Sequence, residues 1–307
     1  MERYQSGRAV TWLSFGLNVV LGLTKCVAGY LGQSRALLAD GLHSLSDLAS
    51  DSAVLFSISL AERPPDREHP YGHHRAANLV TLFIAVSLVA FCVLLVVDSV
   101  RALQRGQPVV PHWPTLVIAI ASIIIKEALF RRTRSIGRRL DSQLLIANAW
   151  HHRTDSLSSL LAAAGIGAAM LFGATWAFLD ALVAVLLGTY LGREGYKLLR
   201  QAIDDLMDAA PAQPLIDDLR EHILVHAGAL AYHDFRARRV GDMLEVDFHL
   251  LVLPSLSVGE AHEVAERVKD EILERHPQVL NVLVHVEPGL PEYHRERGVA
   301  DGTVPVD

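Results

Sequence analysis

Six long segments of mostly apolar residues follow one another in the first two thirds of the chain. They run at about 10–31, 36–60, 77–101, 112–130, 144–172 and 176–198. Each is long enough to cross roughly 30 Å of hydrocarbon as an α-helix that rises 1.5 Å per residue. The second and fifth segments are the least apolar, because polar side chains recur in them. The pattern predicts an all-α membrane bundle of six transmembrane helices over residues 1–208.

The pattern of apolar positions changes at about residue 209. Helical spacing and strand-like alternation then follow each other over short stretches: helices at 213–227 and 257–276, strands at 244–252 and 279–287. Ser257 is a suitable N-cap, and Glu260 three residues later completes a capping box. The order α, β, β, α, β predicts a small α+β domain over 209–290, with a helix layer on a mixed sheet. We expect the tail at 291–307 to be disordered.

Composition supports a membrane protein and excludes several classes of site. The chain has 307 residues, of which 51% are hydrophobic, and its mean hydropathy is +0.27. Its two cysteines, Cys26 and Cys92, lie in apolar runs, which excludes a disulfide framework and a Cys-based zinc site. The net charge is -6 and no uniform basic surface is present, so we expect no nucleic-acid partner.

The basic residues of the loops indicate how the bundle is oriented. An even number of spans places both termini on one side of the lipid bilayer. Most of the loop Arg and Lys residues fall on that side: Arg3, Arg8, Arg63, Arg67, Arg75, Arg131, Arg132, Arg134, Arg138, Arg139, Lys197 and Arg200. Cytoplasmic loops carry the excess of positive charge, so we expect both termini to be cytoplasmic. Because the chain has no long His-rich loop and no organelle signal, we expect a multi-pass protein of the cell (inner) membrane.

One polar pattern, A-[D/N]-x-x-H-x-x-x-D-x-x-S, occurs at 39–50 in the second segment and at 147–158 in the fifth. A histidine and an aspartate at i and i+4 share one face of a helix, about 6 Å apart. Two such helices facing each other would therefore offer four ligands to one metal ion. These candidate ligands are His43, Asp47, His151 and Asp155.

The cost of placing ionisable groups inside a membrane favours a shared cation. Each such group costs roughly 2.5 to 3.5 kcal/mol at mid-membrane, so a stripe of them requires a partner. Four nitrogen and oxygen ligands suit Zn²⁺, whereas Mg²⁺ and Ca²⁺ require six or more oxygens. The alternative is a set of interhelical hydrogen bonds, His43 to Asp155 for example, that only holds the bundle together. Recurrence of the pattern in two spans favours the metal site.

With this paired motif, the chain resembles the cation diffusion facilitator family over about residues 8–290. The resemblance implies a homodimer that exchanges divalent metal for protons, with the four motif residues as transport ligands and a cytoplasmic domain of the metallochaperone-like ferredoxin type. It also implies an ion pair between Arg75 and Asp204. Histidine rather than aspartate at position 43 resembles the zinc-preferring members. Zn²⁺ is therefore the expected cargo, and Cd²⁺, Fe²⁺, Co²⁺ and Mn²⁺ stay open.

Two further groups of residues match metal sites of the family. The loop after the second segment reads Asp66-x-x-His69-x-x-x-His73-His74. It is either an ordinary polar loop or, as in some family members, a loop site made of Asp66, His69 and His73.

The C-terminal domain carries the second group. His249 shares the polar face of its strand with Glu245 and Asp247, and His285 and Glu287 point together at i and i+2. Taken singly, these histidines are ordinary surface residues. Together, the set matches the family's cytoplasmic binuclear site, with Glu287 where Asp is more usual: His233, His249, His262, His285 and Glu287. Metal bound there would bridge or orient two subunits rather than be transported.

Three functions follow from these motifs. The leading hypothesis is efflux of a divalent metal by metal/proton antiport, which makes the protein a secondary transporter and not an enzyme. The alternative is a membrane-anchored metal sensor without transport. An intramembrane metalloenzyme ranks last, because four protein ligands leave no open coordination position. No Walker motif is present in the sequence, so an ATP-driven pump has no support.

Overall fold

The structure is a computed structural model that describes residues 2–61, 63, 65–106, 109–140, 143–241 and 243–289. Inside these ranges some side chains are not described, among them those of residues 2–13, 49–61, 147–148 and 151–152. The tail at 291–307, which the sequence predicts to be disordered, lies outside the described residues.

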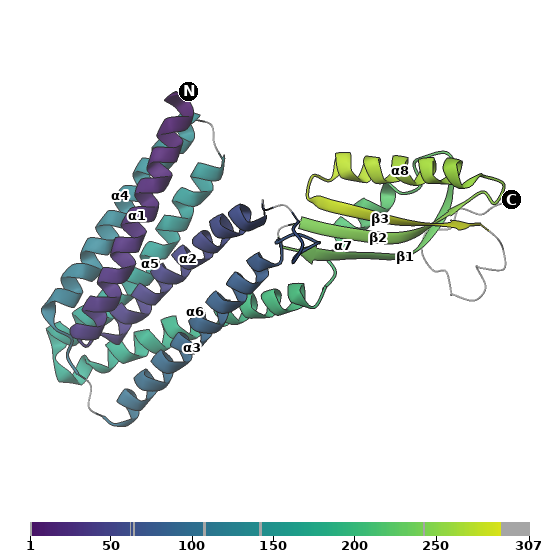
Figure 1. Cartoon of the computed structure of the whole chain (residues 1–307). Coiled ribbons are helices and arrows are strands. Elements are labelled where there is room, and N and C mark those ends of the chain that lie inside the picture. The colour runs from purple at the N-terminus through teal and green to yellow at the C-terminus, as the bar shows by residue number, and fades with distance from the viewer. Residues whose placement is uncertain are drawn as a thin grey trace. The chain divides into compact units, whose positions relative to one another are not determined.

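Six long helices form the N-terminal part of the chain (Figure 1). They are α1 (Glu2–Leu31), α2 (Arg35–Ala61), α3 (Ala76–Gln104), α4 (Trp113–Leu140), α5 (Gln143–Phe172) and α6 (Phe178–Leu206), with the short 3-10 helix η1 (Ala174–Trp176) before α6. Over the described residues, α1, α3, α4, α5 and α6 are long and apolar enough to cross a membrane. The second helix, α2, has 27 residues, but side chains are described only for 35–48, too short a stretch to be assessed in the same way.

Small residues pack the helices closely. Ala36, Ala119 and Ala162 are fully buried and bring α2, α4 and α5 together, and Ala184 of α6 packs against α2 and α3. Lipid is as apolar as a helix surface, so close packing of small side chains is a main source of helix association in a membrane.

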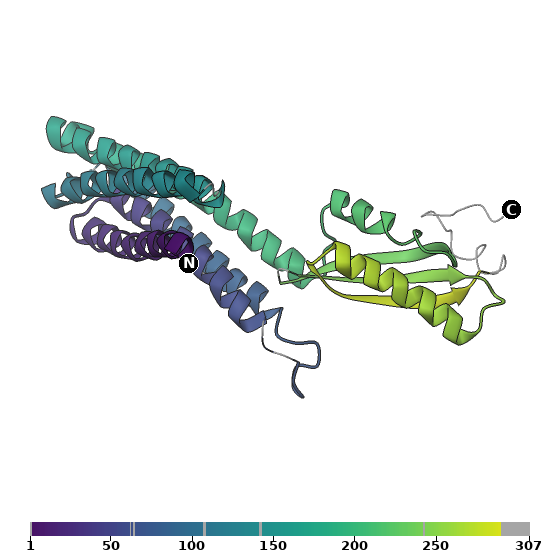
Figure 2. The same ribbon diagram turned by 90° about the horizontal axis from the view of Figure 1, so that it is seen from above.

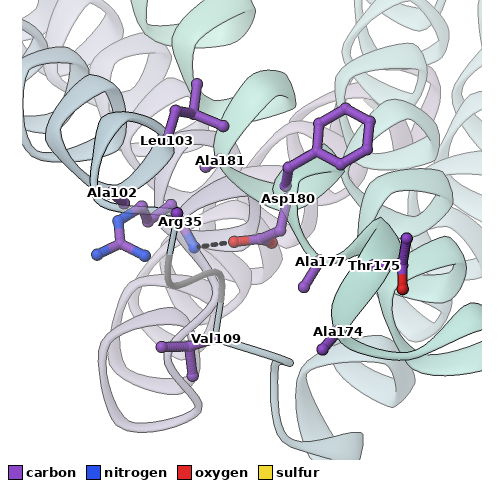
Figure 3. Close-up of a pocket in the computed structure, with 11 residues that line it drawn as sticks. Arg35, Ala102, Leu103, Val109, Ala174, Thr175, Ala177, Asp180 and Ala181 are labelled. Carbon is purple, nitrogen blue, oxygen red and sulfur yellow. Dashed lines mark hydrogen bonds between the residues drawn. The ribbon is translucent and has the colours of Figure 1, made fainter.

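Asp180, at the start of α6, fixes the N-terminus of α2. Its carboxylate accepts hydrogen bonds from the hydroxyl of Ser34 at 2.7 Å, from the backbone N–H of Arg35 at 2.7 Å and from that of Ala36 at 3.3 Å. Figure 3 shows this carboxylate facing Arg35 at a cavity of about 360 Å³, at the same end of the helices as η1. The first N–H groups of a helix lack partners within the helix, so these bonds hold α2 in place near the residues of its polar stripe.

The C-terminal domain has the predicted α+β fold, with a helix layer on a mixed three-stranded sheet (Figures 1 and 2). Its elements are α7 (Gln213–Glu221), β1 (Ala229–Val240), β2 (Met243–Val252), α8 (Val258–Arg275) and β3 (Val279–Pro288). β2 lies in the middle, antiparallel to β1 and parallel to β3. The capping box predicted for the second helix is confirmed, since Ser257 and Glu260 exchange both of its hydrogen bonds.

The two faces of this sheet have different characters. Val246, Phe248 and Leu250 point to one face, where they form a core with apolar residues of α7 and α8. Successive side chains of a strand point to opposite faces, so Asp247 and His249 lie on the face away from the helices.

By compactness the chain divides into two units. The first contains residues up to 55 and 81–199, and the second contains 56–80 and the chain from 200 onward. The connection between α2 and α3 therefore packs with the C-terminal domain, and the position predicted as the domain boundary, 208–209, lies inside the second unit.

A close approach of α1 and α2 depends on a glycine. A Cβ added at Gly41 would lie 2.8 Å from the backbone nitrogen of Cys26. We predict that Gly41→Ala lowers the free energy of unfolding by about 1 to 3 kcal/mol, because the helices must move apart. The matched control is Gly16→Ala, also in a helix but with nothing within 4 Å of the added Cβ. Detergent-solubilised protein would be unfolded with SDS and followed by circular dichroism; equal stability of both variants would contradict the contact.

Candidate metal centres

The helical motifs place three ligands together inside the bundle. His43 and Asp47 of α2 and Asp155 of α5 each offer one ligand atom, and these atoms lie within 4.8 Å of one another. Nδ1 of His43 is 3.9 Å from Oδ1 of Asp47. Asp155 is buried, with 6% of its surface exposed. The fourth candidate, His151, lies one turn before Asp155 on α5, and its side chain is outside the described part of the structure.

The contacts of His43 bear on the alternative of a purely structural hydrogen bond. Nδ1 of His43 is buried and, among the described residues, makes no hydrogen bond. A buried polar atom without a partner is unfavourable by about 1 to 3 kcal/mol, and a bound cation removes that penalty. The geometry therefore favours a ligand role for His43 over a bond to Asp155.

Two buried lysines adjoin this cluster. Nζ of Lys126, on α4, lies 3.9 Å from Oδ2 of Asp155 and 3.4 Å from its carbonyl oxygen. Nζ of Lys25, on α1, lies 2.7 Å from Oδ2 of Asp40. The hydroxyl of Ser44 accepts hydrogen bonds from both lysines, at 3.3 and 3.5 Å. The sequence analysis missed these residues, although a charged side chain inside a predicted span is itself a signal of function.

Asp40 belongs to the helix contacts and, among the residues that the structure describes, is not part of the ligand cluster. Besides Lys25, its carboxylate accepts hydrogen bonds from the hydroxyls of Ser158 at 2.7 Å and Ser159 at 3.1 Å. Ser159 also accepts a bond from Lys25 at 2.9 Å. These contacts tie α1, α2 and α5 together beside the cluster, so Ser158, the serine of the motif copy in α5, has a structural role.

The loop between α2 and α3 gathers the second predicted set. Asp66 lies 3.4 Å from Nδ1 of His69 and 3.5 Å from Nε2 of His73, and the two imidazole rings are 4.5 Å apart. The backbone N–H groups of His69 and Glu68 donate to Asp66 at 2.6 and 2.9 Å. The bond from His69 is the main reason why the pKa of Asp66 is below its usual value. The carboxylate therefore stays ionised beside two imidazoles.

Glu287 is at the centre of the third set, on the sheet face away from the helices. Its carboxylate lies 3.1 Å from Nε2 of His233, 2.8 Å from Nδ1 of His249 and 3.6 Å from Nε2 of His285. Burial acts to raise the pKa of Glu287, but the hydrogen bonds to His249 and His233 outweigh it and hold the pKa below its usual value. Asp234, which the sequence analysis did not single out, lies 3.5 Å from His233.

His262 does not join this set within one chain. It is exposed on α8, and none of the metal-ligating groups among the described residues includes it. The physical reason is the layer order, because α8 covers the apolar face of the sheet and the histidines of the set lie on the other face.

A family model described as the cation efflux transmembrane domain matches residues 11–207, and one described as the cation efflux protein, cytoplasmic domain, matches residues 211–289. The chain belongs to the cation efflux family. This cation efflux protein is a membrane transporter and not an enzyme.

Two relatives illustrate the range of the family. Metal tolerance protein C1 of Arabidopsis thaliana is 36% identical over 94% of this chain, and the chain spans 64% of that relative's length. Manganese efflux system protein MneP of Bacillus subtilis (strain 168) is 29% identical, covering 95% of this chain and 99% of the relative. Among solved structures, a nickel form of the MamM CTD aligns with 26% of this chain and 100% of its own, at 22% identity and a TM-score of 0.25.

Within one chain, the prediction of an ion pair between Arg75 and Asp204 is wrong. Arg75 pairs with Asp208, which also lies 3.4 Å from Arg238. Asp204 lies 3.6 Å from Arg200, one turn earlier on α6. Helix α6 ends at Leu206, and Asp208 follows it with a positive φ of 59°. The backbone therefore changes direction after the helix, and Asp208, which lies beyond this turn, is the residue that reaches Arg75.

Charge reversal tests this pairing. We predict that Arg75→Glu and Asp208→Arg each lower metal transport in vesicles, and that the double variant recovers part of it. Recovery is partial because the new arginine also faces Arg238. The pair is half-exposed, so we expect the free energy of unfolding to change by only about 0 to 1 kcal/mol.

Asp204→Arg is the control for that experiment, since Asp204 lies in the same segment and contacts Arg200 instead. It should transport at close to the wild-type rate. Recovery of Arg75→Glu by Asp204→Arg, and not by Asp208→Arg, would restore the original assignment.

Proposed function

We propose that this protein exports Zn²⁺ from the cytoplasm in exchange for protons, and that His43, Asp47, His151 and Asp155 bind the ion in transit. The observation that carries the proposal is the cluster of His43, Asp47 and Asp155, contributed by two helices of the bundle. A set of histidine and carboxylate ligands from facing helices matches what a four-coordinate zinc ion requires.

The charges around the cluster favour a divalent ion. Asp47 and Asp155 supply two carboxylates, and the ammonium group of Lys126 lies 3.9 Å from one of them. A divalent cation between the carboxylates neutralises the pair, while Lys126 weakens its binding by repulsion. Binding that is favourable but opposed by a nearby charge allows an ion to be released as well as captured.

Proton exchange follows from the chemistry of the same atoms. Zinc binds neutral imidazole and ionised carboxylate, so metal and protons compete for the ligands. Protons that enter from outside would displace the ion, and a proton gradient would then drive export. Rocking of the helices that carry the ligands would open the site alternately to each side.

Manganese is the second candidate cargo. The relative from Bacillus subtilis is named a manganese efflux protein, which favours this ion. Mn²⁺ prefers oxygen ligands, whereas imidazole suits the borderline ion Zn²⁺. The histidines at 43 and 151 therefore place zinc first.

The remaining sites and the topology belong to the same proposal. Both termini lie in the cytoplasm of a cell whose inner membrane holds the protein, and the protein works as a homodimer, in keeping with the matched cytoplasmic domain. The loop set (Asp66, His69 and His73) and the set around Glu287 on the sheet face bind further zinc ions that stabilise the protein. His262 could enter the sheet-face site only from a second copy, because within one chain it lies across the sheet.

Flux measurements test the transport site. In proteoliposomes with an imposed pH gradient, we predict that the wild type moves Zn²⁺ and that His43→Ala, Asp47→Ala and Asp155→Ala reduce the flux to background, because each removes one of four ligands. Asp98→Ala is the matched control, since Asp98 lies on α3 and pairs with Arg35 outside the cluster. Wild-type flux in Asp155→Ala would rule out this site.

Other outcomes of the same assay separate the alternatives. Movement of Mn²⁺ and not Zn²⁺ would keep the site and change the cargo. A zinc flux that does not depend on the pH gradient would show that protons are not exchanged for the metal. Metal binding without flux of any metal would favour the membrane-anchored sensor.

Replacing Lys126 gives a test in which zinc binding should become tighter, whereas a variant that only disrupts the fold should bind more weakly. We predict that Lys126→Met binds Zn²⁺ at least about tenfold more tightly, because a repulsive charge is removed; a tenfold change corresponds to about 1.4 kcal/mol. Lys126→Arg keeps the charge and should bind as the wild type does. Competition with a zinc-sensitive dye in detergent would measure both. Weaker binding in Lys126→Met would contradict the repulsion.

A further inference from the structure

Two histidines at the ends of two helices face each other in the C-terminal domain. His222 is the C-cap of α7 and His276 is the C-cap of α8, and their rings are 5.2 Å apart. Asp218, one turn before His222 on α7, has Oδ2 at 3.7 Å from Nδ1 of His276. One ligand atom from each of the three residues lies within 4.8 Å of the others. The sequence analysis assigned no role to any of them.

His276 is buried in a way that its structural role does not explain. Only 4% of its surface is exposed, and among the described residues its Nε2 atom has no hydrogen-bond partner. Its backbone caps α8 by donating to Ile272 at 2.9 Å and accepts a bond from Val279 at 2.8 Å, and both bonds are open to any residue other than proline. A buried imidazole with a free nitrogen is costly unless a ligand uses it.

The surroundings favour a cation. The C-terminal end of a helix carries partial negative charge, and the ends of α7 and α8 meet here. Glu271 adds a second carboxylate, 3.9 Å from Nδ1 of His222 and 3.9 Å from Nε2 of His226. Arg275 lies 2.9 Å from Glu271 and offsets part of its negative charge. The negative charge of Asp218 still favours a cation at this place.

We propose that Asp218, His222 and His276 bind a divalent transition-metal ion of borderline character, such as Zn²⁺ or Co²⁺. Ligand atoms around a tetrahedral zinc ion are about 3.4 Å apart, a spacing that rotation of the exposed Asp218 side chain can reach. Glu271 or water completes the coordination, and Glu271 also orients His222. The bound ion links α7, the first element of the domain, to the C-terminal end of α8. It does not depend on the transport site, and it lies among the helices, on the opposite side of the sheet from Glu287.

Metal counting in the full-length protein tests the site. The background variant removes the other ligand sets through Asp47→Ala, Asp155→Ala, His69→Ala, His73→Ala, His249→Ala and His285→Ala. After equilibrium dialysis in detergent against Co²⁺, we expect it to retain one ion per chain, with the visible absorption of coordinated cobalt. Adding His222→Gln or Asp218→Asn should weaken that binding at least tenfold. Asp217→Asn, which changes an exposed carboxylate of α7 that contacts Gln213 instead of the cluster, should leave it unchanged.

The result also distinguishes this site from the transporter proposal. His276→Gln is the strongest single test, and if it unfolds the protein the variants of His222 and the exposed Asp218 decide instead. No Co²⁺ retained by the folded background, or equal loss in Asp217→Asn and Asp218→Asn, would overturn the proposal. Zinc flux is measured separately in protein with the other sets intact, so loss of transport by Asp155→Ala has no bearing on this result.

Discussion

Buried charge is the constraint on which the helical bundle depends. Lys25 and Asp40 are fully buried and form an ion pair at 2.7 Å, and Lys126 and Asp155 are buried close by. Removing one member of such a pair leaves an uncompensated charge and typically costs 3 to 5 kcal/mol. The serine hydroxyls that complete the pair come from α2 and α5, so the charges also fix which helix faces meet. The ligand cluster lies beside this network, so the same helix contacts fix the positions of its residues.

The network also separates two roles that look alike in the sequence. Asp40 and Asp47 are both acidic residues of the same polar stripe, but Asp40 is neutralised by Lys25 and held by two serines. Asp47 lies with His43 and Asp155 instead. The two lysines differ in how closely they approach a carboxylate: Lys25 is 2.7 Å from Asp40, whereas Lys126 is 3.9 Å from Asp155, which lies beside a second carboxylate and an imidazole. The close ion pair with Lys25 therefore distinguishes Asp40 from the two aspartates of the candidate ligand cluster.

The C-terminal domain places histidines on both sides of one sheet. The set around Glu287 lies on the face without helices, and His222 and His276 lie between the ends of α7 and α8. Alternation along β2 and β3 produces the first set, and helix termination produces the second. Metal bound to the first would act at a surface open to a second copy, while metal bound to the second would act inside one domain by joining two helices.

The sequence alone determined much of the architecture, because hydrophobic periodicity and capping are local properties. It predicted six helical spans, the α+β order of the C-terminal domain, the capping box at Ser257, and a paired motif from which the structure brings His43, Asp47 and Asp155 together. Only the tertiary structure decided the partners of charged groups far apart in the chain. Lys25 meets Asp40 and Ser159, Arg75 meets Asp208 rather than Asp204, and His262 is held away from Glu287 by the layer order. His222 and His276 show the same limit, since they are 54 residues apart in sequence and meet only because α7 and α8 end at one place.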